Sequence, residues 1–216
     1  MSSVSKPDTF FIGKFNSKTF EIETIKEYPY TEDFFKSLGY KVKKDGEIRF
    51  RGQYKLDIFL NDQGGGYFIA NHKSYYRSTG IVNKELLVIP FDSDLGMGDI
   101  QVIPRHLNSY KPLLNGLGYF AFIREGALNI VYTDNKENLK VKELERARET
   151  ANPMGGSAAI IIAEIDGNNP VKRSVLSTEN KINGYLLPKK CHANESKFVV
   201  NIGNRGKVLY GEILFD

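Results

Sequence analysis

Three stretches of one form recur along this chain: FFIGKFN at residues 10–16, LLVIPFD at residues 86–92 and IIIAEID at residues 160–166. The first and second stretches are offset by 76 residues, and the second and third by 74. Similarity at a regular spacing is typical of repeat architectures. It predicts a fold built from similar units, and it names no reaction or ligand.

A second recurring form, a pair of apolar runs around a turn, lies between these stretches, at residues 58–70, 120–132 and 185–201. Each period of roughly 70 residues then supplies about four strands, the number found in one propeller blade. We predict an all-β fold: a β-propeller-like repeat of about three four-stranded blades, forming a partial ring with one or two short helical insertions. Even strand spacing also permits a β-sandwich, which is the alternative.

The predicted organisation is a flexible N-terminal segment over residues 1–7 and a single β-repeat domain over residues 8–216. Its repeats fall approximately at residues 8–75, 84–135 and 157–216. Three blades leave open edges, and natural proteins cover or pair exposed strand edges. Another chain or a longer protein is therefore expected to complete the ring.

Local patterns give the individual elements. Thr31 is suited to cap a short helix ending near Leu38. Charges of alternating sign over residues 136–150 predict a solvated helix or a long excursion. Turn residues between apolar runs predict strands at residues 9–15, 18–25, 56–60, 67–72, 85–91, 99–103, 119–123, 128–133, 158–165, 171–176, 184–188, 197–202 and 207–215.

The composition argues against several classes of protein. The formal net charge is +4, but Lys and Arg are dispersed along the chain, which argues against nucleic-acid binding. No apolar run approaches the ~18 residues of a membrane span. Residues 1–7 lack the apolar core of a signal peptide. We expect a cytoplasmic protein or, if the sequence is a mature fragment, one of the bacterial cell envelope or a secreted one.

The sequence offers little for catalysis, metals or cofactors. His72, His106 and His192 follow different predicted strands, so a shared zinc site would need three distant loops to meet. The basic neighbours of the single cysteine, Cys191, could lower its thiol pKa, although an ordinary loop thiol is the simpler interpretation. The aspartates gather at turns, where they satisfy local backbone donors. We predict no catalytic residue, no metal and no cofactor.

Candidate binding residues combine aromatic, cationic and polar side chains at strand ends. Loops on a rigid scaffold carry binding residues more often than the scaffold itself. Tyrosine and arginine are also effective anchors for a partner. The predicted binding residues are Tyr75, Tyr76, Arg77, Arg105, His106, Asp134, Asn135, Lys189 and Lys190.

The order of several segments resembles a group of uncharacterised bacterial envelope proteins. The resemblance rests on residues 58–69, residues 86–105, residues 131–139 and the closing Leu186-Leu187-Pro188-Lys189-Lys190. It covers most of residues 10–215 and corresponds to the C-terminal half of those longer proteins. It implies a β-propeller-like fold and an envelope location, and it implies no activity, since none is established for that group.

We therefore predict a non-enzymatic module that binds a protein partner or assembles with another chain to complete a β-propeller. The alternative is a protein, or an enzyme, that binds a small polar ligand or a glycan at the mouth of the ring. That alternative requires a pocket lined by the strand-end residues named above.

Overall fold

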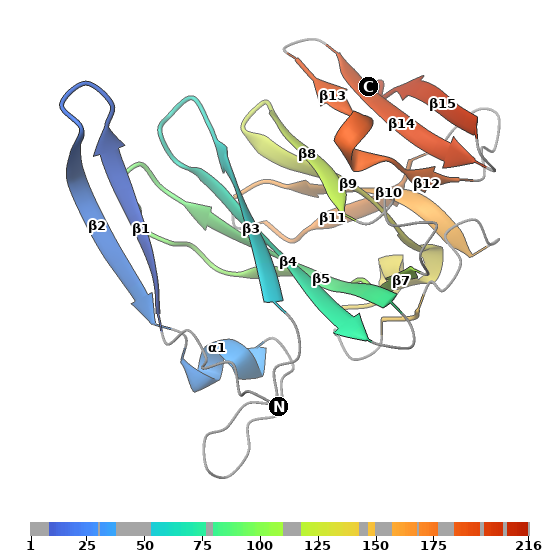
Figure 1. The fold of residues 1–216 in the computed structure, drawn as a ribbon, viewed down its shortest axis with the longest axis horizontal. Coiled ribbons are helices and arrows are strands. Elements are labelled where there is room, and N and C mark those ends of the chain that lie inside the picture. Colours follow the sequence, from blue (N-terminus) through green and yellow to red (C-terminus); the bar gives the residue numbers. More distant parts are fainter. Residues whose placement is uncertain are drawn as a thin grey trace.

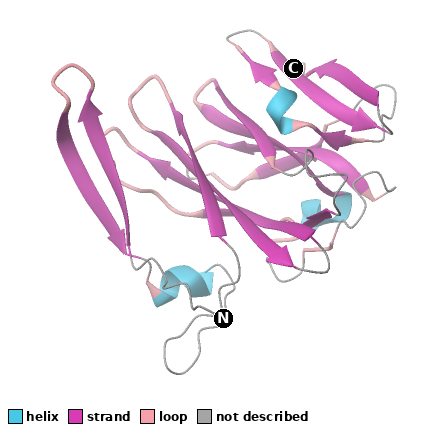
Figure 2. Cartoon of the chain, in the orientation of Figure 1, coloured by secondary structure: helices cyan, strands magenta, loops and turns pink. Residues whose placement is uncertain are grey.

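A computed structural model describes residues 9–29, 31–37, 53–76, 80–109, 118–142, 147–149, 157–167, 169–176, 184–194, 197–204 and 207–215. These residues form four antiparallel sheets. Strands dominate and helices are short (Figure 2). The prediction of an all-β fold is confirmed.

The four sheets follow one another along the chain. The first pairs β1 (Thr9–Asn16) with β2 (Glu21–Pro29). The second contains β3 (Gln53–Leu60), β4 (Gly66–Tyr76), β5 (Gly80–Phe91), β6 (Gln101–Ile103) and β7 (Leu107–Ser109). The third contains β8 (Tyr119–Arg124), β9 (Ala127–Asn135), β10 (Ala158–Ile165) and β11 (Lys172–Val175). The fourth contains β12 (Tyr185–Leu186), β13 (His192–Ala193), β14 (Phe198–Asn204) and β15 (Lys207–Glu212).

The sheets stack face to face in a row, from the N-terminal hairpin to the C-terminal sheet (Figure 1). Ile12 of the first sheet packs against Phe68 and Ile89 of the second. A core that includes Ile69 and Ile130 joins the second sheet to the third, and one that includes Val131 and Val200 joins the third to the fourth. The second and third sheets therefore each pack against a neighbouring sheet on both faces. The row has four layers, whereas the alternative prediction, a β-sandwich, has two.

Strand order within the sheets confirms the predicted hairpins. The second sheet runs β3-β4-β5-β6, with β7 also paired to β5, and the third is a simple meander, β8-β9-β10-β11. The hydrogen-bonded sheets nevertheless divide the chain differently from the predicted repeats. The range 8–75 contains the first sheet and only β3 and β4 of the second, because β4 pairs with β5. The single-domain assignment stays a prediction, and residues 1–7 lie outside the described residues.

The helical segments are short. Helix α1 (Glu32–Ser37) confirms the helix expected after Thr31; its Glu32 and Lys36 form an ion pair at 3.3 Å, and its Phe35 is buried. Residues 143–146 and 150 of the predicted helix over 136–150 lie outside the described residues. Of the rest, only the 3₁₀ helix η2 (Lys136–Lys140) is helical.

Asn138 links two described parts of the stretch over residues 136–150. The Asn138 side chain is buried, donates to the carbonyl of Arg148 and accepts from its backbone N–H, at 2.9 and 2.6 Å. These two bonds hold the backbone of Arg148 against the Asn138 side chain.

A second 3₁₀ helix, η4 (Pro188–Lys190), lies between β12 and β13 of the fourth sheet. Within the described part of the chain, every helix is too short or too polar to cross a bilayer.

Candidate functional site

Four of the predicted binding residues meet between the second and third sheets. Arg105 and His106 lie in the turn from β6 to β7, and Asp134 and Asn135 end β9. The backbone N–H of His106 donates to Asp134 Oδ1 at 3.3 Å. Asn135 accepts from Glu137 and so caps η2. These four residues were predicted to be binding residues at strand ends, and the structure brings them together in the interior.

Arg105 is fully buried, contrary to its expected place on a binding surface. Its Nε donates to the Lys84 carbonyl at 3.0 Å, and its Nη1 donates to the Gly118 carbonyl at 2.9 Å. Its Nη2 donates to Asn71 Oδ1 at 2.7 Å, and its guanidinium carbon lies 5.8 Å from the centre of the Tyr132 ring. The planar guanidinium group of Arg105 therefore links the second sheet to Gly118, the residue before β8. In this position Arg105 is a structural residue.

Asp134 is equally buried, and its carboxylate accepts from Asn138 Nδ2 at 2.9 Å. Burial raises the pKa of Asp134 to about 6, although hydrogen bonds from Asn138 and the Arg105 charge oppose the rise. Burial likewise lowers the pKa of the nearby His106 imidazole. Removal from water disfavours a charge of either sign. Both groups are therefore shifted toward their neutral forms.

The raised pKa of Asp134 makes stability depend on pH. The folded state holds a proton on Asp134 that the unfolded chain, with an ordinary pKa of 3.8, releases at lower pH. The stability that this proton provides is present below about pH 4 and is lost as the pH rises through about 6. Between about pH 4.5 and about pH 7, the free energy of unfolding of the wild type should fall relative to Asp134→Asn by on the order of 2 kcal/mol. Urea denaturation of both proteins measures the difference, and a constant difference would exclude the effect.

The remaining predicted binding residues are not part of this buried group. Lys189 and Lys190 are exposed on η4. Tyr75 and Tyr76 end β4, where they pair with Ile81 and Gly80 of β5. Arg77 lies outside the described residues. The nine predicted residues therefore do not form one surface.

The histidines do not gather either. His72 lies within β4 and is buried; its Nδ1 lies 2.8 Å from Glu85 Oε1 and its Nε2 lies 3.2 Å from Ser74 Oγ. Tyr54 Oη donates to the same Glu85 oxygen at 2.6 Å. This acid, imidazole and hydroxyl have the order of a hydrolase triad, but a nucleophile must reach its substrate and Ser74 is buried. The described residues contain no group of three or more metal-binding side chains.

Cys191 is a half-buried thiol, in line with the simpler interpretation of an ordinary loop thiol, and its pKa is raised rather than lowered. Burial raises the pKa of the thiol, with a smaller opposing effect from the Asn201 N–H. Its Sγ also lies 3.4 Å from the Leu187 carbonyl oxygen. With its pKa raised, this thiol is protonated near neutral pH.

A groove of about 490 Å³ lies at the turn between β8 and β9, where that turn meets the C-terminal segment after β15. The Arg124 guanidinium lies over the Phe215 ring there, 4.2 Å from its centre. None of the predicted strand-end residues lines this groove. The groove therefore differs from the pocket that the alternative function requires.

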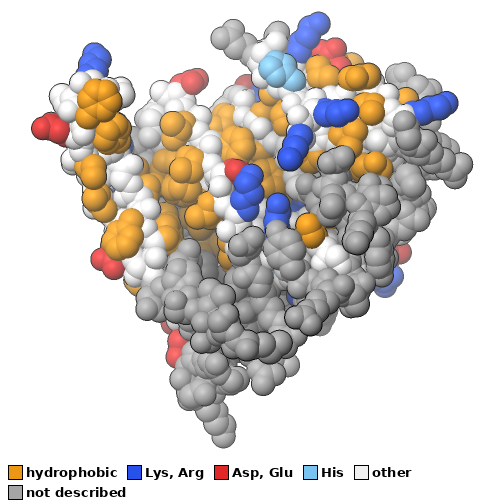
Figure 3. All heavy atoms as spheres, viewed as in Figure 1, with side chains coloured by type: hydrophobic (Ala, Val, Ile, Leu, Met, Phe, Trp, Pro, Cys, Tyr) orange, Lys and Arg blue, Asp and Glu red, His pale blue; other side chains and the backbone are white. Residues whose placement is uncertain are grey.

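Two exposed apolar surfaces were not predicted from the sequence. Leu56, Ile58 and Leu60 of β3 are 51%, 59% and 68% exposed. The hairpin of β1 and β2 exposes a second set: Phe11, Phe15, Phe20, Ile22 and Ile25. Figure 3 shows apolar side chains along both elements, on either side of a notch in the molecule. Alternation predicts which residues share a face, but it does not reveal which faces a neighbouring sheet leaves uncovered.

No protein-family model, curated protein sequence or solved structure matches this chain. The resemblance to bacterial envelope proteins stays a prediction.

Proposed function

We propose that this chain is part of a β-propeller-like ring and that a second copy of the chain completes it. One observation carries the proposal: among the described residues the first sheet has two strands, and the apolar face of β3 is exposed. That surface supports an assembly role.

The first sheet covers only part of the second. Ile12 packs against Phe68 and Phe91, and the Tyr28 hydroxyl donates to the Leu95 carbonyl beyond β5. Ile58 pairs with Phe68 across β3 and β4, so both side chains lie on the face turned toward the first sheet. Phe68 is buried there whereas Ile58 is exposed. A first sheet with additional strands, like the second and third sheets, would cover β3 as well.

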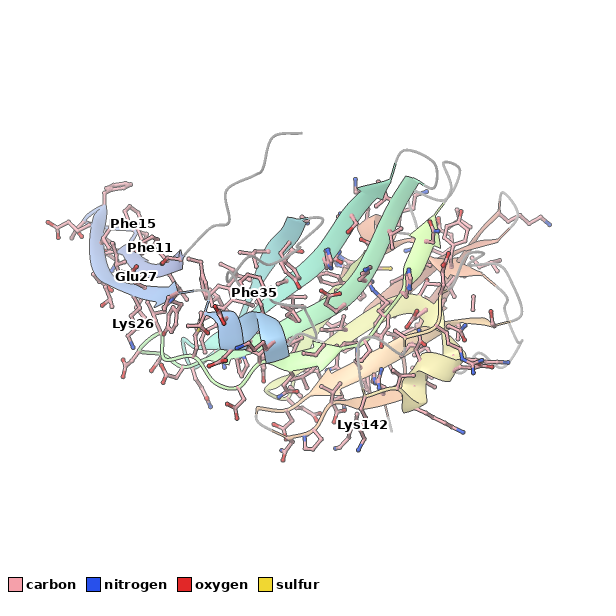
Figure 4. The ribbon with its side chains drawn as sticks, turned by 90° about the horizontal axis from the view of Figure 1, so that it is seen from below. Phe11, Phe15, Lys26, Glu27, Phe35 and Lys142 are labelled. Carbon is pink, nitrogen blue, oxygen red and sulfur yellow. The ribbon has the colours of Figure 1, made fainter. Side chains whose placement is uncertain are left out.

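The exposed apolar residues continue around the hairpin. Phe15 and Phe20 contact each other edge to face, with ring centres 6.2 Å apart, and both are exposed. Figure 4 shows Phe11 and Phe15 on the hairpin at one end of the row of sheets. Covering one half-exposed leucine, isoleucine or phenylalanine contributes about 1 kcal/mol, so a contact over several of them is substantial. Contiguous exposed patches of this kind mark protein interaction sites.

A second copy of the chain fits the exposed apolar residues at both ends of the row of sheets. At the C-terminal end, Tyr210 of β15 and Leu214 are 75% and 81% exposed. Contact between the first sheet of one copy and the last sheet of the other uses both ends at once. Such a head-to-tail contact, made twice, closes a ring of two chains.

Two matched variants test the surface. Ile58→Lys places a charge on the uncovered face of β3, while Val175→Lys alters another exposed β-branched residue on β11, 44% exposed and away from β3. Light scattering after size exclusion should give a chain mass of 24.4 kDa for Ile58→Lys and twice that mass for Val175→Lys. Equal masses for the two variants would show that β3 is not in the contact.

A further inference from the structure

Polar side chains share one face of the second sheet, next to the third sheet. Lys55 and Asp57 of β3 pair with Asn71 and Ile69 of β4, and Lys73 lies two residues beyond Asn71. Since alternate residues and direct partners share a face, Lys55, Asp57, Asn71 and Lys73 lie on the side that holds Ile69 in the core between the sheets. This face is the opposite of the one proposed for assembly.

Asn83 of β5 lies beside Lys73. The two residues are direct partners between β4 and β5, so their side chains are neighbours on this face. Asn83 is fully buried, and neither its Oδ1 nor its Nδ2 has a hydrogen-bond partner within the described part of the chain. A buried amide without a partner is costly, and in native proteins such a group calls for an explanation.

The third and fourth sheets contribute the other side of the cluster. Tyr119 of β8 donates to Asp57 Oδ2, and the Gly118 carbonyl accepts from Arg105. A Cβ added at Gly118 would lie 3.7 Å from Pro188 Cγ, which places η4 and its Lys189 beside this junction. In Figure 3, Lys and Arg side chains gather near the middle of the displayed face.

Positive charge exceeds negative charge in this cluster. Desolvation by burial lowers the pKa of Lys73, and the charges of Lys55, Arg105 and Lys189 lower it further. Asp57 is the one acidic group that acts against this lowering. Its carboxylate is already bonded by Tyr119 and by Lys55 Nζ, which lies 3.1 Å from Oδ1. Lys73 therefore has cations around it and no carboxylate of its own.

We propose that Lys73, Lys55, Lys189 and the amide of Asn83 bind a tetrahedral oxyanion, such as a phosphate or a sulfate group. Lysine ammonium groups act as point charges that suit a phosphate, and the three lysines come from β3, β4 and η4. The guanidinium of Arg105 is already bonded and adds only its charge. The Asn83 Nδ2 supplies a donor that the protein itself leaves unused.

Thermal unfolding in inorganic phosphate, with sodium chloride at matched ionic strength, tests the site. A ligand that binds only the folded state raises the melting temperature. Phosphate and sulfate should raise it for the wild type and for Lys207→Met, a control at the exposed first residue of β15. For Lys73→Met, phosphate affinity by calorimetry should fall about tenfold or more, because one charge-assisted contact is lost.

A second measurement needs no variant. Phosphate should slow acetylation of Lys73 in the unmodified protein relative to acetylation of Lys207, as measured by mass spectrometry. The proposal is overturned if phosphate stabilises no more than chloride, if Lys73→Met and Lys207→Met respond alike, or if Lys73 is not protected. Equal stabilisation by acetate would overturn the assignment to a tetrahedral anion. The self-association described above is independent of all these outcomes.

Discussion

Replacement of Arg105 by methionine should lower the free energy of unfolding by about 3–5 kcal/mol, because it removes one member of a buried polar network. The guanidinium donates to the Lys84 and Gly118 carbonyls and to Asn71. All three acceptors would lose a partner away from water, and each loss carries a desolvation penalty. Urea denaturation followed by circular dichroism measures the change.

A matched control separates this effect from the loss of any arginine. Arg148 also makes an ion pair, with Glu137, but its side chain is 68% exposed. Arg148→Met should cost less than about 1 kcal/mol, as exposed ion pairs do. Arg105→Lys keeps the charge but not the planar fork, and an intermediate loss is expected. If Arg105→Met unfolds like Arg148→Met, the interior role of Arg105 is wrong.

The second large effect is expected at Gly66, the first residue of β4. A Cβ there would lie 2.1 Å from the Phe59 carbonyl oxygen and 3.1 Å from Leu60 Cα, both backbone atoms. Gly66 also pairs with Phe91, so β4 cannot move away from β3 without disturbing β5. Gly66→Ala should cost about 2–3 kcal/mol or more, since inserted volume in a packed site forces the backbone apart.

Gly211 provides the comparison for that substitution. It lies in β15, and the nearest atom to an added Cβ is Val200 Cγ2 at an ordinary 3.6 Å. Gly211→Ala should change stability by less than about 1 kcal/mol, because an added methyl fits there and restricts the unfolded chain. Thermal melts of both variants decide the point. Similar losses at the two glycines would contradict the close packing of β3, β4 and β5.

The hairpins could be predicted from the sequence because alternation and turn residues are local. Tyr119 to Thr133 shows this well, since the turn at Glu125 and Gly126 joins β8 and β9 as expected. The division into sheets could not be predicted in the same way. A hairpin joins the next strand in one sheet only where the two form hydrogen bonds, as β4 and β5 do. Nothing in the local sequence of a hairpin distinguishes the hairpins that form such bonds from those that do not.

The candidate site was harder to predict for physical reasons. Arg105 follows a strand, where loops are normally exposed, yet acceptors on two sheets allow its burial. Lys73 and Asn83 are partners only because of an irregularity in the pairing after Asn71, where the register of β4 and β5 shifts. A shift of one residue changes the face of every later side chain. The alternation of Lys55 and Asp57 along β3 was the one signal of this face in the sequence.

The molar mass of the unmodified chain in solution tests the central proposal most directly. Sedimentation equilibrium over a range of concentrations should give a complex of two 24.4 kDa chains and no larger species, as expected for a closed ring. A single chain at every concentration would contradict completion of the sheet row by a second copy. An open series of growing oligomers would contradict closure of the ring.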